Sequence, residues 1–590
     1  MKTKSRRKSS REILCSITVS IAIFILCMLL TAPLAAGNET GGLIDKVSGK
    51  AETIIYFKDI KKGLRPFLRS GFYREAEDLS IFKGPIRTDV SAPAISTLGD
   101  VEKSLGLSIT PGRIILLMGK DAAIYKTRTG GGKASVAVLE VGWLKRFLIK
   151  IVSSLKGSIS RENIDGISAF STNAGNKKVY YALTASHVIF SDSSLALKSQ
   201  YDTLAGGGDT IVNNPDFKRG ISAVPAGYHV LIYHKITKPE PYETKLIKRG
   251  ERLLGEVDTI FTSITFTKSG ADVSLYAPLK SDETEKIIAG LGDVGKKPAP
   301  EIENLPSEAA GFVAFNSYDP TILYANFVKN WFSGVFEQVN YISILQKWKT
   351  EAGFDLEGGI LSNITGGTLL AVTGIGYEGR EPYVKVFSCL GIREGGEEAV
   401  SENLSNIFDY AFWDDGPSYF EYNRARLYYM GELREEEVDW SGSKYIKTSV
   451  ANPGFGINQN RLYFYRDIST IERLLNAPVL NKINEAGGKK LFDEDFLVKS
   501  GAYLDAQKDL PLGNYDLYLY LSGENLTNTV EKYIINLNAH YRYFLYEDAE
   551  KRLIPLLELT RESFVSFYGG INFGQDAIEG KFRLVAKDLN

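Results

Sequence analysis

One short segment of the sequence contains residue types that could form a hydrolytic active site. Residues 186–192 read SHVIFSD, so Ser186, His187 and Asp192 lie within seven positions of a chain that has four histidines in all. A serine nucleophile, a histidine base and an aspartate that orients the histidine form a catalytic triad when the imidazole lies within about 3 Å of both partners. The chemistry to consider is therefore acyl transfer or hydrolysis.

The residues around this segment favour a structural role. Alternating apolar positions predict a strand, in which the consecutive side chains of Ser186 and His187 leave opposite faces. Asp192 is followed by serines and then by apolar residues at helical spacing, which predicts a helix N-cap. Later in the chain Asp467 again precedes a helical pattern, whereas Arg461 stands where His187 would be. We therefore interpret the segment as the end of a strand and the start of a helix.

Other motifs predict neither a cofactor site nor a metal site. TGGGKAS at 129–135 is similar to a phosphate-binding loop. However, Ala134 replaces the hydroxyl that would bind magnesium, and a strand follows where a helix must begin, which predicts a hairpin turn. His229 and His234 have an odd spacing that places them on opposite faces of a strand, so they cannot share a metal ion. We assign no catalytic residue, no cofactor and no metal ligand.

The composition excludes two further classes of function. The first 37 residues hold six basic residues and one acidic residue; the rest of the 590-residue chain has 64 Lys+Arg and 70 Asp+Glu, a net charge of −6. This balance does not attract nucleic acid. Two of the three cysteines lie within residues 13–36, which leaves Cys389 alone in the remainder of the chain. A disulfide within that part and a zinc site of several cysteines are therefore both excluded.

Residues 1–37 predict export across a membrane. Basic residues precede an uncharged apolar run of 24 residues at 13–36. As a helix this run would be about 36 Å long, which is enough to anchor the chain in a bilayer. Its end, rich in small residues, is also typical of a cleaved signal peptide, so both alternatives stay open. Either way we expect a periplasmic or cell-surface protein, whose partner is the membrane if the segment is retained.

The exported part predicts two related halves. Residues 293–307 are rich in proline and charge and lack aromatics, which is typical of a linker between 38–292 and 308–590. Without a gap, Ile264 and Phe266 near the end of the first half align with Ile571 and Phe573 near the end of the second. The order of strand-like and helix-like segments is also shared. We therefore predict a tandem duplication of α+β units, each with a large, mostly antiparallel sheet and packed helices. Helices are expected near 62–80, 143–156, 193–204, 320–351, 396–411, 469–486 and 525–557.

One expected helix is unusually aromatic. Phe327, Trp331, Phe332 and Phe336 recur at nearly helical spacing within 320–351. The simplest interpretation is a helix packed on the sheet. A groove for a lipid or another apolar ligand is the alternative, because helices that cross a large sheet can leave cavities.

A series of short motifs in both halves carries a resemblance to a known family. It includes GFDL at 353–356, ITGG at 364–367, a strand that passes through a Ser/Asp step into a helix at 190–197, and Asp-Phe elements at 216–217 and 495–496. In this order the motifs resemble an uncharacterised family of exported bacterial proteins that share a domain of unknown function. The resemblance implies an architecture and an exported location, but no activity. We therefore expect a non-enzymatic structural, interaction or ligand-binding protein, with a lipid carrier and a hydrolase as alternatives.

Overall fold

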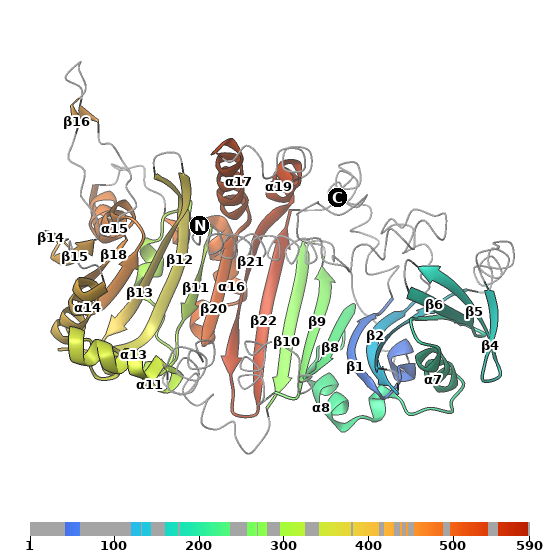
Figure 1. Cartoon of the computed structure of the whole chain (residues 1–590). Coiled ribbons are helices and arrows are strands. Elements are labelled where there is room, and N and C mark those ends of the chain that lie inside the picture. Colours follow the sequence, from blue (N-terminus) through green and yellow to red (C-terminus); the bar gives the residue numbers. More distant parts are fainter. Residues whose placement is uncertain are drawn as a thin grey trace.

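The computed structural model describes sixteen stretches of the chain, drawn in colour in Figure 1. The described residues are 42–59, 120–130, 132–142, 160–174, 177–236, 257–267, 269–279, 295–324, 341–378, 381–411, 418–429, 437–438, 444–445, 453–487, 496–540 and 553–587. The predicted signal or anchor at 1–37 and the helices expected near 62–80 and 143–156 lie outside them. Within these stretches no helix is both long enough and apolar enough to span a membrane.

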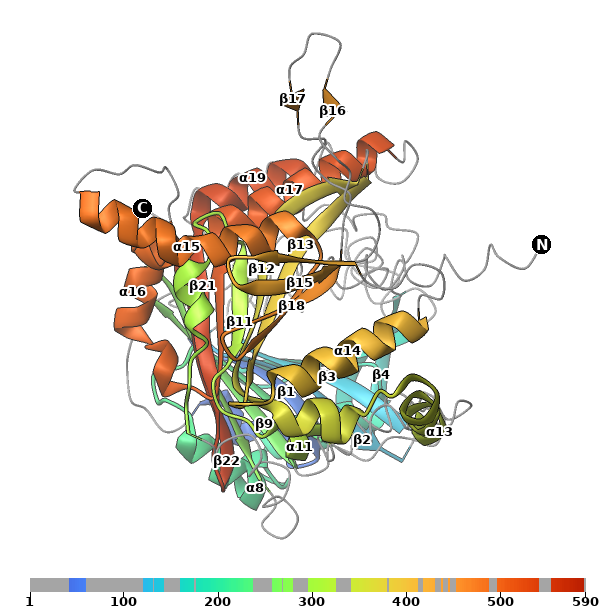
Figure 2. The ribbon, with the colours of Figure 1, turned by 90° about the vertical axis from the view of Figure 1, so that its left-hand side faces the viewer.

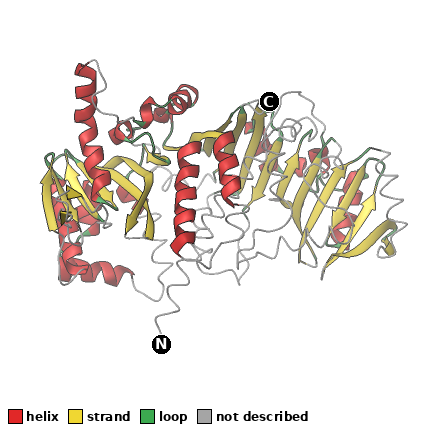
Figure 3. Ribbon diagram, turned by 90° about the horizontal axis from the view of Figure 1, so that it is seen from above, coloured by secondary structure: helices red, strands yellow, loops and turns green. Residues whose placement is uncertain are grey.

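Twenty strands join into one antiparallel sheet that extends along the molecule (Figures 1 and 3). From edge to edge the pairings give the order β14-β15-β18-β19-β13-β12-β11-β20-β21-β22-β10-β9-β8-β1-β2-β3-β7-β6-β5-β4. Their bounds are β1 Ala51–Phe57, β2 Ala122–Thr129, β3 Gly132–Glu140, β4 Ser160–Ile164, β5 Ile167–Ala174, β6 Lys177–Leu183, β7 His187–Ser191, β8 Val230–Lys235, β9 Thr259–Thr267, β10 Gly270–Pro278, β11 Gly311–Phe315, β12 Ile364–Glu378, β13 Glu381–Ile392, β14 Ser418–Tyr422, β15 Ala425–Tyr429, β18 Gly454–Asn458, β19 Arg461–Tyr465, β20 Leu517–Ser522, β21 Phe564–Phe573 and β22 Ala577–Ala586. A separate short hairpin pairs β16 (Glu437–Val438) with β17 (Lys444–Tyr445).

The predicted α+β class with antiparallel strands is confirmed, but the strands do not form a separate sheet in each half. Strand β10, from the first half of the sequence, pairs with β22 from the second half along nine residues, from Gly270 opposite Val585 to Pro278 opposite Ala577. This seam merges both groups of strands into one layer. Alternating side chains give the layer two faces, which we name the Tyr125 face and the Ile124 face after neighbouring residues of β2.

Helices cover the Tyr125 face in both parts of the sheet. In the first part, Leu197 of α7 and Phe217 of α8 enter a core with Tyr125 and other buried strand residues. In the second part, Ile471 of α15 and Tyr503 of α16 enter the corresponding core beneath β11, β12, β13, β19 and β20. Figure 2 shows α15 and α16 on the side of the sheet opposite α14. The helix bounds are α7 Ser194–Leu204, α8 Pro215–Ala223, α11 Pro320–Leu323, α13 Tyr341–Lys347, α14 Glu397–Ala411, α15 Ile468–Gly487, α16 Gly501–Asp509, α17 Gly523–His540 and α19 Ile554–Ser563.

The Ile124 face is covered unevenly. At the outer end of the second part, Val400 and Leu404 of α14 pack against Phe455 and Leu462. Helices α17 and α19 contact β12, β13, β20 and β21. In the first part, the described helices α7 and α8 both lie on the Tyr125 face, where their apolar residues are buried. Ile124 itself is 41% exposed.

The stretch predicted as a linker is packed into the second part of the protein. Its residues Pro300–Asn304 form the 3-10 helix η4, and Ile302 and Leu305 are buried in the same core as Ile471. An ion pair holds this turn: the guanidinium of Arg461 in β19 donates to both carboxylate oxygens of Glu301 at 2.6 Å. The segment therefore connects two groups of strands and also forms part of the second core.

Candidate functional site

The structure brings Ser186 and His187 together but leaves Asp192 apart. Ser186 Oγ and His187 Nδ1 lie 2.9 Å apart, within hydrogen-bond distance, although we predicted that these side chains would diverge. The prediction was wrong because Ser186 belongs to the bend before β7, where strand alternation does not yet apply. Asp192 follows the far end of β7 and accepts the backbone N–H of Ser135 at 2.8 Å. Asp192 comes five residues after His187 along an extended strand, which is roughly 16 Å of chain, so Asp192 does not complete a triad.

The predicted helix start is present, with a different capping residue. Helix α7 begins at Ser194, and Ser193 caps it by accepting the backbone N–H of Ala196 at 3.4 Å. Asp192 cannot take this role because its carboxylate is bound to β3. At α15 the aspartate does act as the cap: Asp467 accepts the backbone N–H of Thr470 at 3.1 Å.

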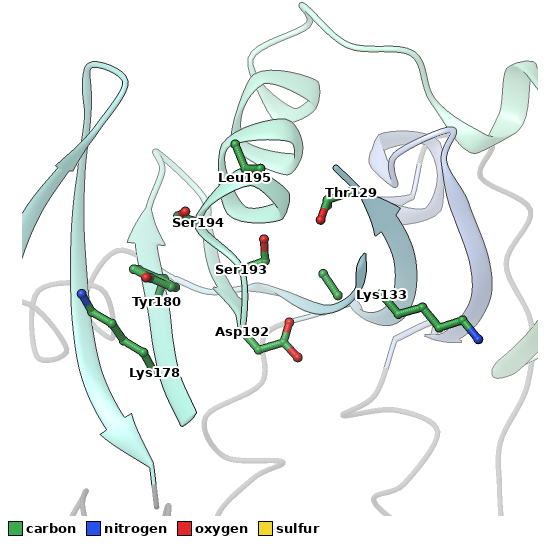
Figure 4. A pocket seen from close by; sticks show the side chains of 9 residues that line it. Thr129, Lys133, Lys178, Tyr180, Asp192, Ser193, Ser194 and Leu195 are labelled. Atoms are coloured by element: carbon green, nitrogen blue, oxygen red, sulfur yellow. The ribbon is translucent and has the colours of Figure 1, made fainter. Parts of the chain in front are cut away.

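A polar hollow of about 450 Å³ lies where α7 begins, but its side chains do not converge (Figure 4). In Figure 4 the side chain of Lys133 extends away from Asp192 and the three residues that follow it. Lys178 is bound to Glu162 through an ion pair, and this pair lowers the pKa of the glutamate. The hollow therefore offers no acid, base and nucleophile in mutual reach. Its lining is Thr129, Lys133, Ala134, Lys178, Tyr180, Asp192, Ser193, Ser194 and Leu195.

Two further histidines, His229 and His234, have structural partners. His229 accepts the backbone N–H of Phe266 on its Nδ1 at 3.0 Å, and the two rings stack. Nδ1 of His234 lies 2.9 Å from Thr53 Oγ1, and burial lowers the pKa of this imidazole. Across the described stretches, no three His, Cys, Asp or Glu side chains gather as they would around a metal ion.

The aromatic residues proposed for an apolar groove cannot be placed. Phe327, Trp331, Phe332 and Phe336 lie outside the described residues, and so does most of the helix expected at 320–351. That groove stays a prediction from the sequence. A second hollow of about 610 Å³ lies between residues 298–303 and 498–512, with the exposed side chain of Leu504 in its lining.

A different apolar feature, which the sequence analysis missed, crosses the Ile124 face of the first part. Directly opposed residues of nine neighbouring strands form a line that is apolar except for one threonine; we name it the apolar row. Eight of its nine members keep some solvent exposure, and Tyr181 is buried. The row consists of Phe170, Tyr181, Phe190, Ala137, Ile124, Ile55, Ile232, Thr262 and Leu275. The signal that could have located it is alternation: Ile55 and Ile124 each follow the outward phase of their strand.

Basic side chains border the apolar row on the same face. Two and four residues beyond Ile124 along β2, Lys126 and Arg128 are exposed, and Lys133 lies opposite Arg128. We name these three residues the basic border. Arg128 forms an ion pair with Glu52 at 2.6 Å. The first part therefore presents an apolar surface with positive charge at one side.

The second part places another exposed aliphatic residue at the comparable position. Strand β12 lies between β11 and β13 as β2 lies between β1 and β3, and its Leu370 is 45% exposed. Val372 lies two positions beyond Leu370 opposite Val386 and, after a register shift, Ile375 follows opposite Val384. The second part therefore has an exposed aliphatic residue at this place but no counterpart of the basic border.

Comparisons with known proteins identify no family. No protein-family model and no curated protein matches the chain. A search of solved structures gives crystal form IV of TP0453, with a TM-score of 0.22 and 12% identity over 40% of this chain and 79% of that chain. Crystal form I of TP0453 gives a TM-score of 0.21 and 11% identity over 42% and 82% of the two chains. Similarity at this level supports no conclusion about fold or function.

Proposed function

We propose that this protein is an exported, membrane-associated, non-enzymatic binding protein, built from two related α+β units, that holds apolar partners on the Ile124 face. Export follows from the basic N-terminus and the uncharged run at 13–36. The proposal includes membership of the uncharacterised family of exported bacterial proteins that the sequence motifs resemble. The observation that carries it is the exposure of Ile124 and Leu370 at comparable places on the sheet.

The strand order supports two related units. Counted inward from its outer edge, the first unit runs β4-β5-β6-β7-β3-β2-β1-β8-β9-β10. The second runs β14-β15-β18-β19-β13-β12-β11-β20-β21-β22. Each strand of one series has a counterpart at the same place in the other. In both series the first strand lies between the second and the eighth strand of its unit, a connection that two unrelated halves have no reason to share.

Strand register supports the same relation. In the first unit Phe266 lies opposite Ala271, and in the second Phe573 lies opposite Ile578, a shift of 307 residues on both strands. At β7 and β19 the register places His187 opposite Glu140 and Arg461 opposite Gly391. These strand pairings are consistent with the sequence alignment in which Arg461 stands where His187 would be.

Two tight turns also correspond. The β4–β5 hairpin turns at Asp165 and Gly166, with φ of 44° and 85°. The β14–β15 hairpin turns at Asn423 and Arg424, with φ of 49° and 66°. Two consecutive positive φ angles are typical of the type I′ turn that closes a two-residue hairpin. A turn of this kind at matching places is consistent with descent from one ancestral unit.

The seam between the units has the symmetry expected of an ancestral homodimer. Ser274 of β10 lies opposite Lys581 of β22, and these residues are counterparts under the same shift of 307. Gly270 opposite Val585 and Pro278 opposite Ala577 then lie at equal distances on either side. An antiparallel pair of equivalent strands has a two-fold axis at its centre. We infer that the linked units dock as two copies of one unit would.

The exposure of aliphatic side chains supports a binding role for the Ile124 face. Ile124 and Leu370 belong to interior strands of the sheet, because β2 and β12 are each paired with a strand on both sides. Single exposed apolar residues are common on protein surfaces, but Ile124 belongs to a contiguous row of partly exposed apolar side chains. A surface of this kind is typical of contact with a lipid or another apolar partner. It favours the apolar-carrier alternative over a purely structural role.

A photolabelling experiment tests the proposed function. The full chain is held in phosphatidylcholine nanodiscs, exposed to a diazirine-bearing hexadecanol, irradiated, and digested for mass spectrometry. We expect labels on peptides that contain β1, β2, β8 and β12. Replacing both Ile124 and Leu370 by Asp should remove most of this labelling, because a carboxylate on the face opposes apolar contact.

Leu195→Asp is the matched control, because Leu195 is 53% exposed but belongs to α7, which packs on the Tyr125 face. It should leave the labelling unchanged. The assignment to the Ile124 face is refuted if the labels persist in the double variant. It is also refuted if the labels concentrate around Leu504 in the second hollow.

A further inference from the structure

We propose that the Ile124 face of the first unit binds a single-chain acidic amphiphile, such as a long-chain fatty acid, with its chain along the apolar row and its acid group at the basic border. This inference rests on the proposed function, because it specifies the ligand class for the same face. It also distinguishes the two units, of which only the first carries the basic border among the residues described.

The apolar row has the length of a long acyl chain. From Ile124 the row continues through Ile55, Ile232 and Thr262 to Leu275, one residue on each successive strand. Four steps between neighbouring strands, each about 4.8 Å, give roughly 19 Å. All five side chains keep some exposure, so a chain lying across the strands would contact each of them.

The charges around Ile124 favour an acidic head group. Lys126 lies beside the row, and Lys133, opposite Arg128, lies two residue pairs further along the β2–β3 hairpin. Neither lysine forms an ion pair with a described residue, whereas Arg128 is partly neutralised by Glu52. Another carboxylate on this side, that of Asp192, is bound to the backbone N–H of Ser135. Two lysine ammonium groups are therefore available to a carboxylate or phosphate group.

The polar neighbours of Lys126 do not oppose an anion. Opposite Lys126 stand Thr53 on β1 and Ser135 on β3, which bring hydroxyl groups. Beyond Thr53, the pKa of His234 is lowered by burial, so this side chain is neutral near pH 7. An acid group at Lys126 would thus have hydroxyl groups beside it, while the two carboxylates of this region are bound elsewhere, Glu52 to Arg128 and Asp192 to the backbone of Ser135.

The second unit supplies an internal comparison. At the places that Lys126 and Arg128 occupy beyond Ile124, strand pairing puts Val372 and Ile375 beyond Leu370. An apolar chain can contact Leu370, but no cation at these two places would select for an acid. We therefore expect acid selectivity at β2 and no such selectivity at β12.

Photolabelling with a matched pair of probes tests this assignment on the full chain in phosphatidylcholine nanodiscs. The acid probe is a diazirine-bearing palmitate and the neutral probe is the corresponding hexadecanol. We expect the palmitate to label β1, β2 and β8 more strongly than the alcohol does. The double variant Lys126→Glu, Lys133→Glu should reduce palmitate labelling by about tenfold or more, the worth of a charge-assisted hydrogen bond. Labelling by hexadecanol should not change.

Controls separate this inference from the proposed function. Leu370→Asp should leave palmitate labelling of β2 intact while it removes labelling of β12. If both probes label β2 equally and the double Glu variant changes neither, the inference is refuted while the proposed function stands. If neither probe labels the face, both fail.

Two other occupants would give different results. Vesicles that contain phosphatidylglycerol are mixed with the protein and sedimented. Binding that depends on Lys126 and Lys133, without palmitate labelling of β2, would overturn the inference in favour of a membrane surface. A dimer that dissociates in Ile124→Asp would overturn it in favour of a second copy of the chain.

Discussion

The ion pair between Arg461 and Glu301 provides the sharpest test of how the second unit is held together. The guanidinium bridges both carboxylate oxygens at 2.6 Å, and it also donates to Gly367 O at 3.0 Å and approaches Cys389 Sγ at 2.9 Å. The two charged side chains are 14% and 7% exposed. Replacing Arg461 by Met leaves the Glu301 carboxylate buried without its cation, which costs about 3–5 kcal/mol.

Hydrogen exchange measures this loss where it acts. In η4 the amide of Ile302 donates to Ala299 O, and that of Leu305 donates to Ile302 O. In Arg461→Met we expect these amides to exchange faster by roughly 100-fold to 3,000-fold, the equivalent of about 3–5 kcal/mol of opening free energy. Peptides from the first unit should keep their rates.

Two matched variants show whether buried charge is the cause. Replacing Glu301 by Leu together with Arg461→Met should restore slow exchange, because an apolar pair of similar volume removes the unpaired charge. Lys508→Met breaks an ion pair whose partners are 76% and 74% exposed, so it should change exchange by at most about fivefold. The reasoning is refuted if the exchange rates in Arg461→Met stay within threefold of wild type. It is also refuted if the double variant exchanges as fast as the single one.

Three further predictions concern individual contacts. The Lys349 ammonium and a backbone N–H lower the pKa of Asp355. The ionised carboxylate of Asp355 therefore stabilises the fold fully above the ordinary aspartate pKa of about 3.9. This stabilisation is lost as the pH falls towards the pKa in the folded state. Asp355→Ala should therefore cost about 1 kcal/mol at pH 7 and less at pH 3 in urea unfolding, and an equal cost at both pH values would contradict this. Tyr56→Phe removes the hydroxyl that donates a hydrogen bond to buried Asp121 at 2.5 Å. We expect it to lower the free energy of unfolding in urea by about 1.5–3 kcal/mol. A loss below about 0.5 kcal/mol would show that this hydrogen bond does not stabilise the fold. Ser274→Pro in β10 should destabilise the sheet by more than ~1 kcal/mol, because proline cannot donate a backbone hydrogen bond from β10 to its neighbour β9, and thermal unfolding equal to that of Ser274→Ala would argue against it.

Local patterns in the sequence predicted several elements within one or two residues. The helix starts near 193 and 469 were found because a polar cap precedes apolar residues at helical spacing, and α7 and α15 begin at Ser194 and Ile468. The hairpin expected within 264–279 is the β9–β10 pair. Helix α8 was predicted only as a short Asp-Phe element and α16 was not predicted, because nine residues give too few turns for a clear periodicity.

The SHVIFSD segment shows where local rules stop. Its helix start follows from the sequence, but the contact between Ser186 and His187 depends on the bend that precedes β7. The position of Asp192 depends on β3, which is more than 50 residues earlier in the chain. A strand pattern indicates which residues alternate, but it does not show where the strand begins or which strand lies beside it.

The sequence by itself determined the α+β class and the principal helix starts, because both depend on residues close together in the chain. It also predicted related halves, through similar segments in the same order. Only the tertiary structure decided that β10 pairs with β22 in one sheet, that Glu301 is buried in an ion pair with Arg461, and that Lys126 and Lys133 border the apolar row. These features arise from contacts between distant strands, and periodicity along one strand carries no information about its neighbour.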